Sequence, residues 1–266
     1  LGVRRQRQMC IRDRSKTKVN PADIEDIVVG CAFQVGEQSF NIGKLTTFLS
    51  GMEIHTSGMT VDRWCGSSVE AIHVAAGKIA MGAGKVFVCG GVESMTRVTT
   101  GFEPIPYPYT DKENPNVYFS MGITAENVAK RYKISRTEQQ EFAIQSHQKA
   151  NEAEVNGKFK NEIVEIAGCK KDGNIRPKSN QETLDGLKLA FDQQGTVTAA
   201  TSSPLTDGAA ATLICEESYA KENGLEILGR IVATGVKGCE PDVMGPGPIG
   251  ACLLYTSDAA DERLSV

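Results

Sequence analysis

Short apolar runs alternate with helical patterns in the N-terminal part of the chain, and this alternation constrains the fold more than any other feature. Residues 27–32 (IVVGCA) and 85–94 (KVFVCGGVES) are typical of buried strands, and residues 60–64 indicate another strand. Residues 41–50 and 68–81 are helical, the second with apolar side chains at every third or fourth position. Strand–helix–strand units in this order predict an α/β fold with a mainly parallel sheet covered by helices.

Composition narrows the functional classes. A net charge of −4 and a pI near 5.6 give no nucleic-acid footprint, and no run of about 20 apolar residues predicts a membrane span. The eight cysteines form no C-x-x-C pair, and the histidines at 55, 73 and 147 lie far apart, so we expect no metal site. Dispersed cysteines in an ordinary globular composition indicate a reduced, intracellular protein. We expect a cytoplasmic location, with the mitochondrial matrix or a peroxisome as the alternative in a eukaryote.

The two ends of the chain differ from its middle. Residues 1–15 and 252–266 continue no periodic pattern, and we interpret both as foreign or disordered tails. Residues 16–96 carry the strand–helix units, whereas prolines at 104, 106, 108 and 115 interrupt this pattern in the next segment. Helical patterns follow, and strand-like runs return at 212–215 and 228–234.

Cys65 is the candidate nucleophile. It stands where the expected strand 60–64 turns into the helix 68–81. Free N–H groups and the positive end of the dipole at a helix start stabilise negative charge on sulfur, and the thiolate is the nucleophilic form. Gly66 leaves the sulfur open to another molecule. From the residues alone, a buried structural thiol remains the alternative, because free cysteine is among the most buried residue types.

Other chemistry-bearing side chains favour structural roles. His73 lies about two turns beyond Cys65 on the same expected helix, too far to act as its base. Cys89, at the end of an apolar strand, is typical of a packed thiol. Glu93 and Asp207 are expected to fix loops by accepting hydrogen bonds from backbone N–H groups.

Four motifs in register give the chain a family resemblance. They are VDRWCGSS at 61–68, CGGVESMTR at 89–97, MGITAENVAKRYKISRTEQ at 121–139 with SHQKA at 146–150, and GTVTAATSSPLTDGAAA at 195–211. A weaker match is MGPGPIGA at 244–251. Together they resemble the thiolases, acyltransferases that make or cleave the carbon–carbon bond of 3-ketoacyl-CoA.

The resemblance implies a thiolase-like fold, a layered αβα arrangement with a mainly parallel or mixed sheet. Residues 16–96 would form the N-terminal nucleophile domain, 97–204 a helical loop domain that covers CoA, and 205–251 a return to the N-terminal domain. The full-length form would be a homodimer or tetramer. CoA would be a substrate, and no permanently bound cofactor or metal is implied.

The resemblance also assigns roles to residues. Cys65 aligns with the cysteine that is acylated, and its backbone N–H suits one half of an oxyanion hole. The CoA chain would be held by residues matching the family's pantetheine path: Met121, Phe191, Ala199 and Ser203.

Several departures from the family pattern stand out. Ser120 replaces a common histidine, and Ala200 replaces a common glycine. The Gly-His-Pro histidine and the Cys-x-Gly cysteine of the second thiolase half have no counterpart, so we expect a truncated fragment with little turnover by itself. Two alternatives stay open: a ketoacyl-synthase-like condensing enzyme, or an inactive fragment that binds CoA.

Overall fold

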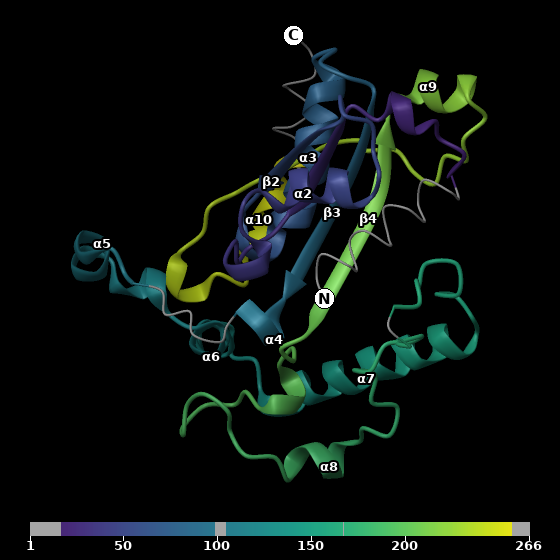
Figure 1. The fold of residues 1–266 in the computed structure, drawn as a ribbon. Helices are drawn as coiled ribbons and strands as arrows, with labels where there is room; N and C mark the ends of the chain where they lie inside the picture. The colour runs from purple at the N-terminus through teal and green to yellow at the C-terminus, as the bar shows by residue number, and fades with distance from the viewer. Residues whose placement is uncertain (1–16, 99–104, 167, 257–266) are drawn as a thin grey trace. The chain divides into compact units, whose positions relative to one another are not determined.

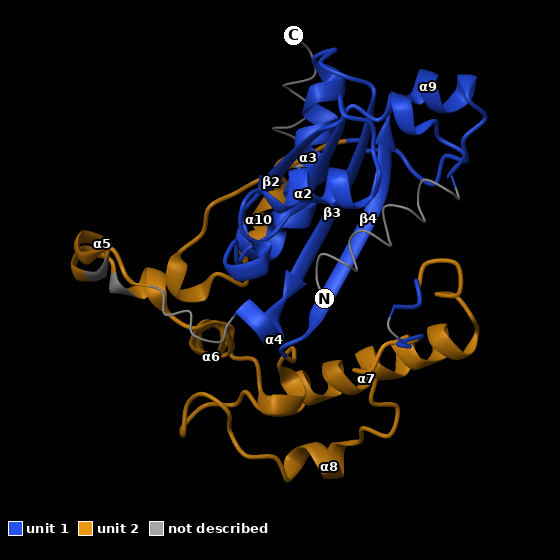
Figure 2. Cartoon of the chain, viewed as in Figure 1, with its two compact units in different colours: residues 1–103, 164–170, 205–232 blue, residues 104–163, 171–204, 233–266 orange. Residues whose placement is uncertain are grey.

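The computed structural model describes residues 17–98, 105–166 and 168–256. The chain divides into two compact units (Figure 2). The first unit contains residues 1–103, 164–170 and 205–232, and the second contains 104–163, 171–204 and 233–266. The tail expected at 1–15 lies outside the described residues, as do residues 257–266 of the tail expected at 252–266.

The first unit is built on a mixed sheet in the strand order β2-β1-β3-β4 (Figure 1). β1 (Asp26–Gly30), β2 (Ser57–Val61) and β3 (Val86–Ser94) run parallel, and β4 (Asp207–Cys215) pairs antiparallel with β3. Parallel pairing of β1 with both neighbours confirms the predicted strand–helix–strand units, and the antiparallel β4 makes the sheet mixed.

Both faces of this sheet are buried. Ile27 and Val29 of β1 belong to one apolar cluster, which includes Ile42 of α2 (Ile42–Leu49). Val28 belongs to a second cluster on the opposite face, with Ala71 and Ala75 of α3 (Ser67–Ala80). Alternate side chains of a strand point to opposite faces, so two-sided burial explains why this strand reads as a continuous apolar run.

The second unit is mainly helical. Its α-helices are α5 (Pro108–Glu113), α6 (Met121–Tyr132), α7 (Arg136–Val155), α8 (Gln181–Asp185) and α10 (Gly247–Thr256). Helix α7 starts with the predicted capping box, in which Ser135 and Glu138 exchange hydrogen bonds with each other's backbone N–H groups. The first unit also contains two short helices, α4 (Met95–Val98) and α9 (Glu217–Glu222).

The structure differs from the sequence prediction toward the C-terminal end. No strand forms over residues 228–234, where Leu228 and Val232 are 89% and 69% exposed. Residues from 233 onward group with the second unit, whereas we expected 205–251 to stay together. Arg131 of α6 accounts for part of this grouping, since it pairs with Asp242 at 2.9 Å and also with Glu240. Helix α10 also continues past residue 251, where we expected the tail to begin.

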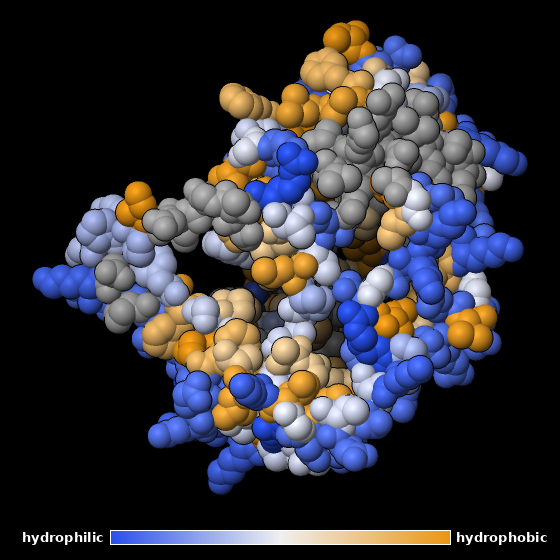
Figure 3. Space-filling view, turned by 60° about the horizontal axis from the view of Figure 1, so that its bottom comes forward, coloured by the Kyte–Doolittle hydropathy of each residue, from blue (hydrophilic) through white to orange (hydrophobic). Residues whose placement is uncertain are grey.

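Several large apolar side chains lie on the surface of the first unit. Phe40, Ile54 and Met81 are 91%, 82% and 86% exposed. Hydrophobic residues also appear among hydrophilic ones on the face drawn in Figure 3. Within the described residues, no helix combines the length and apolar character that crossing a membrane requires.

Candidate active site

Cys65 lies on the turn that joins β2 to α3. It is the middle residue of a short 3-10 helix, Trp64–Gly66, and α3 begins two residues later at Ser67. Its side chain is exposed. The structure therefore rules out the buried structural thiol and leaves Cys65 accessible to a reactant, just ahead of the N-terminus of a 14-residue helix.

The turn is held by a closed set of hydrogen bonds. The Asp62 carboxylate accepts from the Trp64 N–H at 2.8 Å. The Ser67 hydroxyl accepts from the Arg63 N–H at 2.8 Å and donates to the Trp64 carbonyl at 2.6 Å. Trp64 has a φ of 48°, a left-handed conformation that costs energy for a residue with a bulky side chain. The residue before Cys65 is thus strained and fixed by its neighbours.

Two glycines seat the start of α3 on the sheet. Gly30 and Gly91 are paired in register at the C-terminal part of β1 and β3. A Cβ atom on Gly30 would lie 2.4 Å from the Ser67 carbonyl carbon, and one on Gly91 would lie 1.9 Å from the Ser68 hydroxyl oxygen. The helix start therefore rests on the carboxyl edge of the parallel strands, where ligand sites of open α/β sheets are found.

The three histidines bind other groups, and for His73 this agrees with its predicted structural role. His73 lies 3.5 Å from Glu70, its neighbour on α3. His55 contacts the Ala22 carbonyl at 2.9 Å, and His147 accepts a hydrogen bond from the Arg176 N–H at 3.2 Å. The guanidinium of Arg63, 2.8 Å from Glu70, lowers the pKa of that carboxyl.

Of the two carboxylates that we expected to fix loops, Glu93 does so, whereas Asp207 binds the start of helix α4. Glu93 accepts hydrogen bonds from the N–H groups of Ala32 and Phe33 at 2.8 and 3.3 Å. Asp207 accepts from the N–H group of Thr96 at 3.0 Å and from its hydroxyl at 2.8 Å. Glu93 thus ties the loop after β1 to the central sheet, and Asp207 ties the start of α4 to β4.

Cys31 and Cys89 are buried, and the packed role predicted for Cys89 is confirmed. The Cys89 thiol donates to the Ala71 carbonyl at 3.3 Å. Burial, followed by nearby Asp26, raises the pKa of Cys89 to about 12. Burial, followed by nearby Glu93 and Asp62, likewise raises the pKa of Cys31 to about 12.

We therefore expect Cys31 and Cys89 to resist iodoacetamide at pH 9 in the folded protein, although an ordinary thiol with a pKa of 9.0 is half ionised there. Both should become labelled once urea unfolds the chain, because their raised pKa values depend on the fold. Peptide mapping by mass spectrometry gives the extent at each cysteine, with exposed Cys239 as the internal standard. Labelling of either thiol at the rate of Cys239 before unfolding would contradict this assignment.

In the second unit, three of the four residues predicted to hold CoA come from one segment, residues 189–203. Phe191 is half exposed, and Ala199 and Ser203 are exposed. The segment is folded on itself, since the Ala190 N–H donates to the Val197 carbonyl at 3.0 Å. The ring of Phe191 lies against Gly122, where a Cβ would come within 2.2 Å of it. This contact places Phe191 next to Met121, the fourth predicted residue.

A buried glutamate attaches this segment to α6. Glu126 is 8% exposed, and its carboxylate accepts from the N–H groups of Thr196 and Val197 at 2.8 and 2.9 Å. The Thr196 hydroxyl adds a bond to Glu126 at 3.2 Å and accepts from the Gln139 amide at 2.9 Å. The predicted CoA segment is thus held by polar side chains of α6 and α7.

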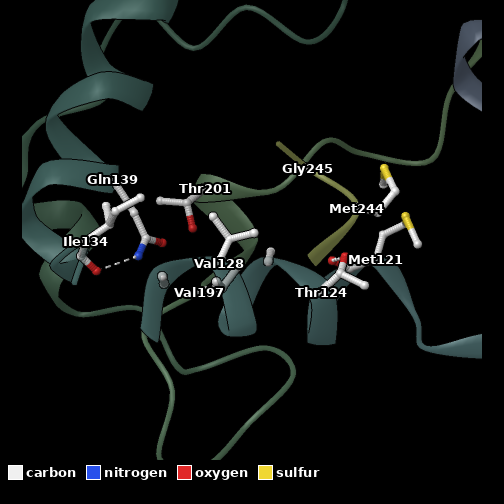
Figure 4. Close-up of a pocket in the computed structure, with 11 residues that line it drawn as sticks. Met121, Thr124, Val128, Ile134, Gln139, Val197, Thr201, Met244 and Gly245 are labelled. Carbon is white, nitrogen blue, oxygen red and sulfur yellow. Dashed lines mark hydrogen bonds between the residues drawn. The ribbon is translucent and has the colours of Figure 1, made fainter. Parts of the chain in front are cut away.

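A pocket of about 320 Å³ opens beside this attachment (Figure 4). Figure 4 shows Met121 and Met244 together at one end and Ile134 with Gln139 at the other. Met121 is the one predicted residue among its walls. The full lining is Met121, Thr124, Ala125, Val128, Ala129, Ile134, Gln139, Val197, Thr201, Met244 and Gly245.

The sequence prediction missed most of these pocket residues. Signals for them existed, because Val197 and Thr201 lie within the motif at 195–211 and Met244 opens the motif at 244–251. Within the described residues, no three His, Cys, Asp or Glu side chains are grouped to hold a metal ion.

The fold and the turn together define an α/β protein with an accessible thiol at the start of a helix. Comparison with known proteins identifies its family. The chain matches the family "Thiolase, N-terminal domain" over residues 8–218, so it belongs to the thiolase family. That match begins within the segment 1–15 that we interpreted as foreign, which lies outside the described residues.

Individual relatives agree with the family match. The chain is 43% identical to the 3-ketoacyl-CoA thiolase of Hahella chejuensis over 246 residues, covering 88% of this chain and 62% of that protein. It is also 43% identical to that of Pseudoalteromonas translucida over 243 residues. These matches favour the thiolases over ketoacyl synthases. The chain spans less than two thirds of the length of these relatives.

A solved structure confirms the fold class. Human mitochondrial 3-ketoacyl-CoA thiolase, crystallised in complex with CoA, superposes with a TM-score of 0.83 at 28% identity. The superposition covers 94% of this chain and 68% of the human chain. The layered, mixed α/β fold predicted from the sequence is therefore that of a thiolase.

Proposed function

We propose that this chain carries the nucleophile of an acyl-CoA acyltransferase that cleaves 3-ketoacyl-CoA or condenses acetyl-CoA. The observation that carries the proposal is the exposed Cys65 thiol on the strained turn at the start of α3, in a chain of the thiolase family. The curated relatives are 3-ketoacyl-CoA thiolases, which supports the same reaction class.

In the degradative direction, the Cys65 thiolate attacks the 3-keto carbonyl and forms a carbon–sulfur bond. The bond between carbons 2 and 3 of the substrate then breaks, and acetyl-CoA leaves as its enolate, which takes up a proton. The thiol of free CoA attacks the acyl-Cys65 thioester, which yields a shortened acyl-CoA and regenerates Cys65. We assign the backbone N–H of Cys65 to one half of the oxyanion hole.

We further propose that Met121, Phe191, Ala199 and Ser203 contact the CoA chain. Their support is the attachment of segment 189–203 to α6 and the human relative's complex with CoA. A homodimer or tetramer is proposed for the full-length protein, with the exposed apolar side chains of the first unit as supporting evidence. A cytoplasmic location is proposed from its bacterial relatives.

Bromoacetyl-CoA tests this function without requiring a complete catalytic cycle. The Cys65 thiolate should attack the carbon that bears bromine, which breaks the carbon–bromine bond, releases bromide and leaves a thioether on Cys65. If the chain binds CoA, we expect Cys65 to react at least about tenfold faster than with bromoacetamide, because binding raises the local concentration of the reagent. Site-resolved mass spectrometry measures both rates.

Two controls accompany this experiment. Exposed Cys239 should react with the two reagents at similar rates, and excess CoA should protect Cys65 but not Cys239. Equal rates at Cys65 with both reagents, unaffected by CoA, would contradict the proposed function.

A further inference from the structure

Glu93 clamps the loop that follows β1. Its carboxylate accepts hydrogen bonds from Ala32 and Phe33, as described above, and from the Gln38 side-chain amide at 2.6 Å. Glu93 comes from β3, near the end of the strand on which α3 is seated. A single carboxylate on the sheet thus accepts hydrogen bonds from two places in the segment that follows β1.

Gln38 completes the clamp. It is fully buried, and its amide nitrogen donates to the Phe33 carbonyl at 2.8 Å while its oxygen accepts from the Ser94 N–H at 2.7 Å. Phe33 is therefore held at both backbone groups, by Glu93 at its N–H and by Gln38 at its carbonyl. A buried polar network in which each member has a partner fixes one conformation of the chain.

The clamped residue supports the turn that carries Cys65. The Phe33 ring meets the Trp64 ring edge to face, with 5.5 Å between centroids and an interplanar angle of 89°. An aromatic pair in this arrangement is favourable beyond its buried area. Trp64 is the residue with the strained φ of 48°, and it directly precedes Cys65. The contact gives that strained conformation an external support.

We propose that Glu93 is a positioning residue for Cys65, acting through the clamped Phe33 and its contact with Trp64. The inference rests on the proposed function for the role of Cys65. It assigns to Glu93 no contact with substrate. Loss of the carboxylate should free Phe33, release Trp64 and let Cys65 leave its place ahead of the N-terminus of α3.

The variant Glu93→Gln tests this, and Trp64 reports on it directly because it is the chain's one tryptophan. Quenching of its fluorescence by acrylamide should rise, with a limit of about 1.6-fold, the ratio of full exposure to its present 64%. Iodoacetamide labelling of Cys65, measured relative to Cys239 in the same sample, should fall about two- to fivefold as the thiol leaves its place ahead of the N-terminus of α3. Thermal unfolding confirms that each sample is folded.

Asp207→Asn is the matched control. Asp207 also accepts a hydrogen bond from a backbone N–H, that of Thr96 in α4, and it lies on β4 directly opposite Ser94, the neighbour of Glu93. Its described hydrogen bonds go to Thr96, so this variant should leave both readouts unchanged. An equal response in Asp207→Asn would overturn the proposal, because any loosened loop would then move the turn.

Phe33→Leu decides the matter if Glu93→Gln does not fold. It removes the ring contact and leaves the carboxylate network in place, so the proposal expects the same rise in quenching and the same fall in Cys65 labelling. Unchanged readouts in Phe33→Leu would overturn the proposal. Neither readout requires CoA, so a failure of bromoacetyl-CoA to label Cys65 would count against the proposed function and not against the support of the turn.

Discussion

Replacing Gly30 by alanine should destabilise the first unit by about 3 kcal/mol and displace the start of α3. The new Cβ would lie 2.4 Å from the Ser67 carbonyl carbon and 2.5 Å from the Ser68 nitrogen. Both atoms belong to the backbone, so no side chain can rotate away. The helix must move, and the turn that carries Cys65 must move with it.

The measurement is urea unfolding of Gly30→Ala, combined with iodoacetamide labelling of Cys65 relative to Cys239. We expect a lower unfolding midpoint and a changed labelling ratio. Gly77→Ala provides the matched control, because Gly77 lies on the same helix with nothing within 4 Å of its added Cβ. That change should stabilise the protein by about 1 kcal/mol, since alanine is the better helix former. A Gly30→Ala variant that unfolds at the wild-type midpoint would contradict this prediction, because α3 would then have moved without loss of stability.

Local patterns were sufficient to predict most of the sheet. The apolar runs at 27–32 and 85–94 became β1 and β3, because strands buried on both faces need apolar side chains at every position. The run at 228–234 shows where this reasoning fails. Its composition is similar, yet Leu228 is 89% exposed, because a strand also requires a neighbouring strand to pair with.

The candidate site, too, could be predicted only in part from the sequence. The position of Cys65 on a strand-to-helix turn follows from hydrophobic periodicity, and the structure adds that the thiol is exposed. The support of that turn could not be predicted, because Glu93 and Gln38 are 55 residues apart and Phe33 meets Trp64 only through the fold. Such contacts leave no periodic signal in the sequence.

The prediction of CoA contacts in the second unit came from family resemblance alone. Nothing in the spacing of Met121 and Phe191 predicts that the Phe191 ring lies against Gly122. The attachment through Glu126 was also missed, since a glutamate within a helical pattern is ordinarily solvated. Because the structure shows that this carboxylate is buried, the attachment through Glu126 can be tested by substitution.

Glu126→Gln should lower stability by about 2–3 kcal/mol and weaken CoA binding about tenfold, if segment 189–203 holds CoA as proposed. The carboxylate presents oxygen atoms to the N–H groups of Thr196 and Val197 at 2.8 and 2.9 Å. A glutamine must turn its NH₂ group toward one of these donors, and that donor is then buried without an acceptor. Isothermal titration with CoA and urea unfolding measure the two effects separately.

Glu138→Gln is the matched control for this last prediction. Glu138 is an exposed member of the α7 capping box and accepts from the Ser135 N–H at 2.7 Å. Hydrogen bonds from the Ser135 hydroxyl and backbone N–H lower the pKa of Glu138, so its loss should affect the start of the helix but not segment 189–203. If Glu126→Gln loses stability while CoA binding stays at the wild-type level, Glu126 supports only the fold. Because stability and CoA affinity are measured separately, a displacement of segment 189–203 can be distinguished from a general loss of its folded structure.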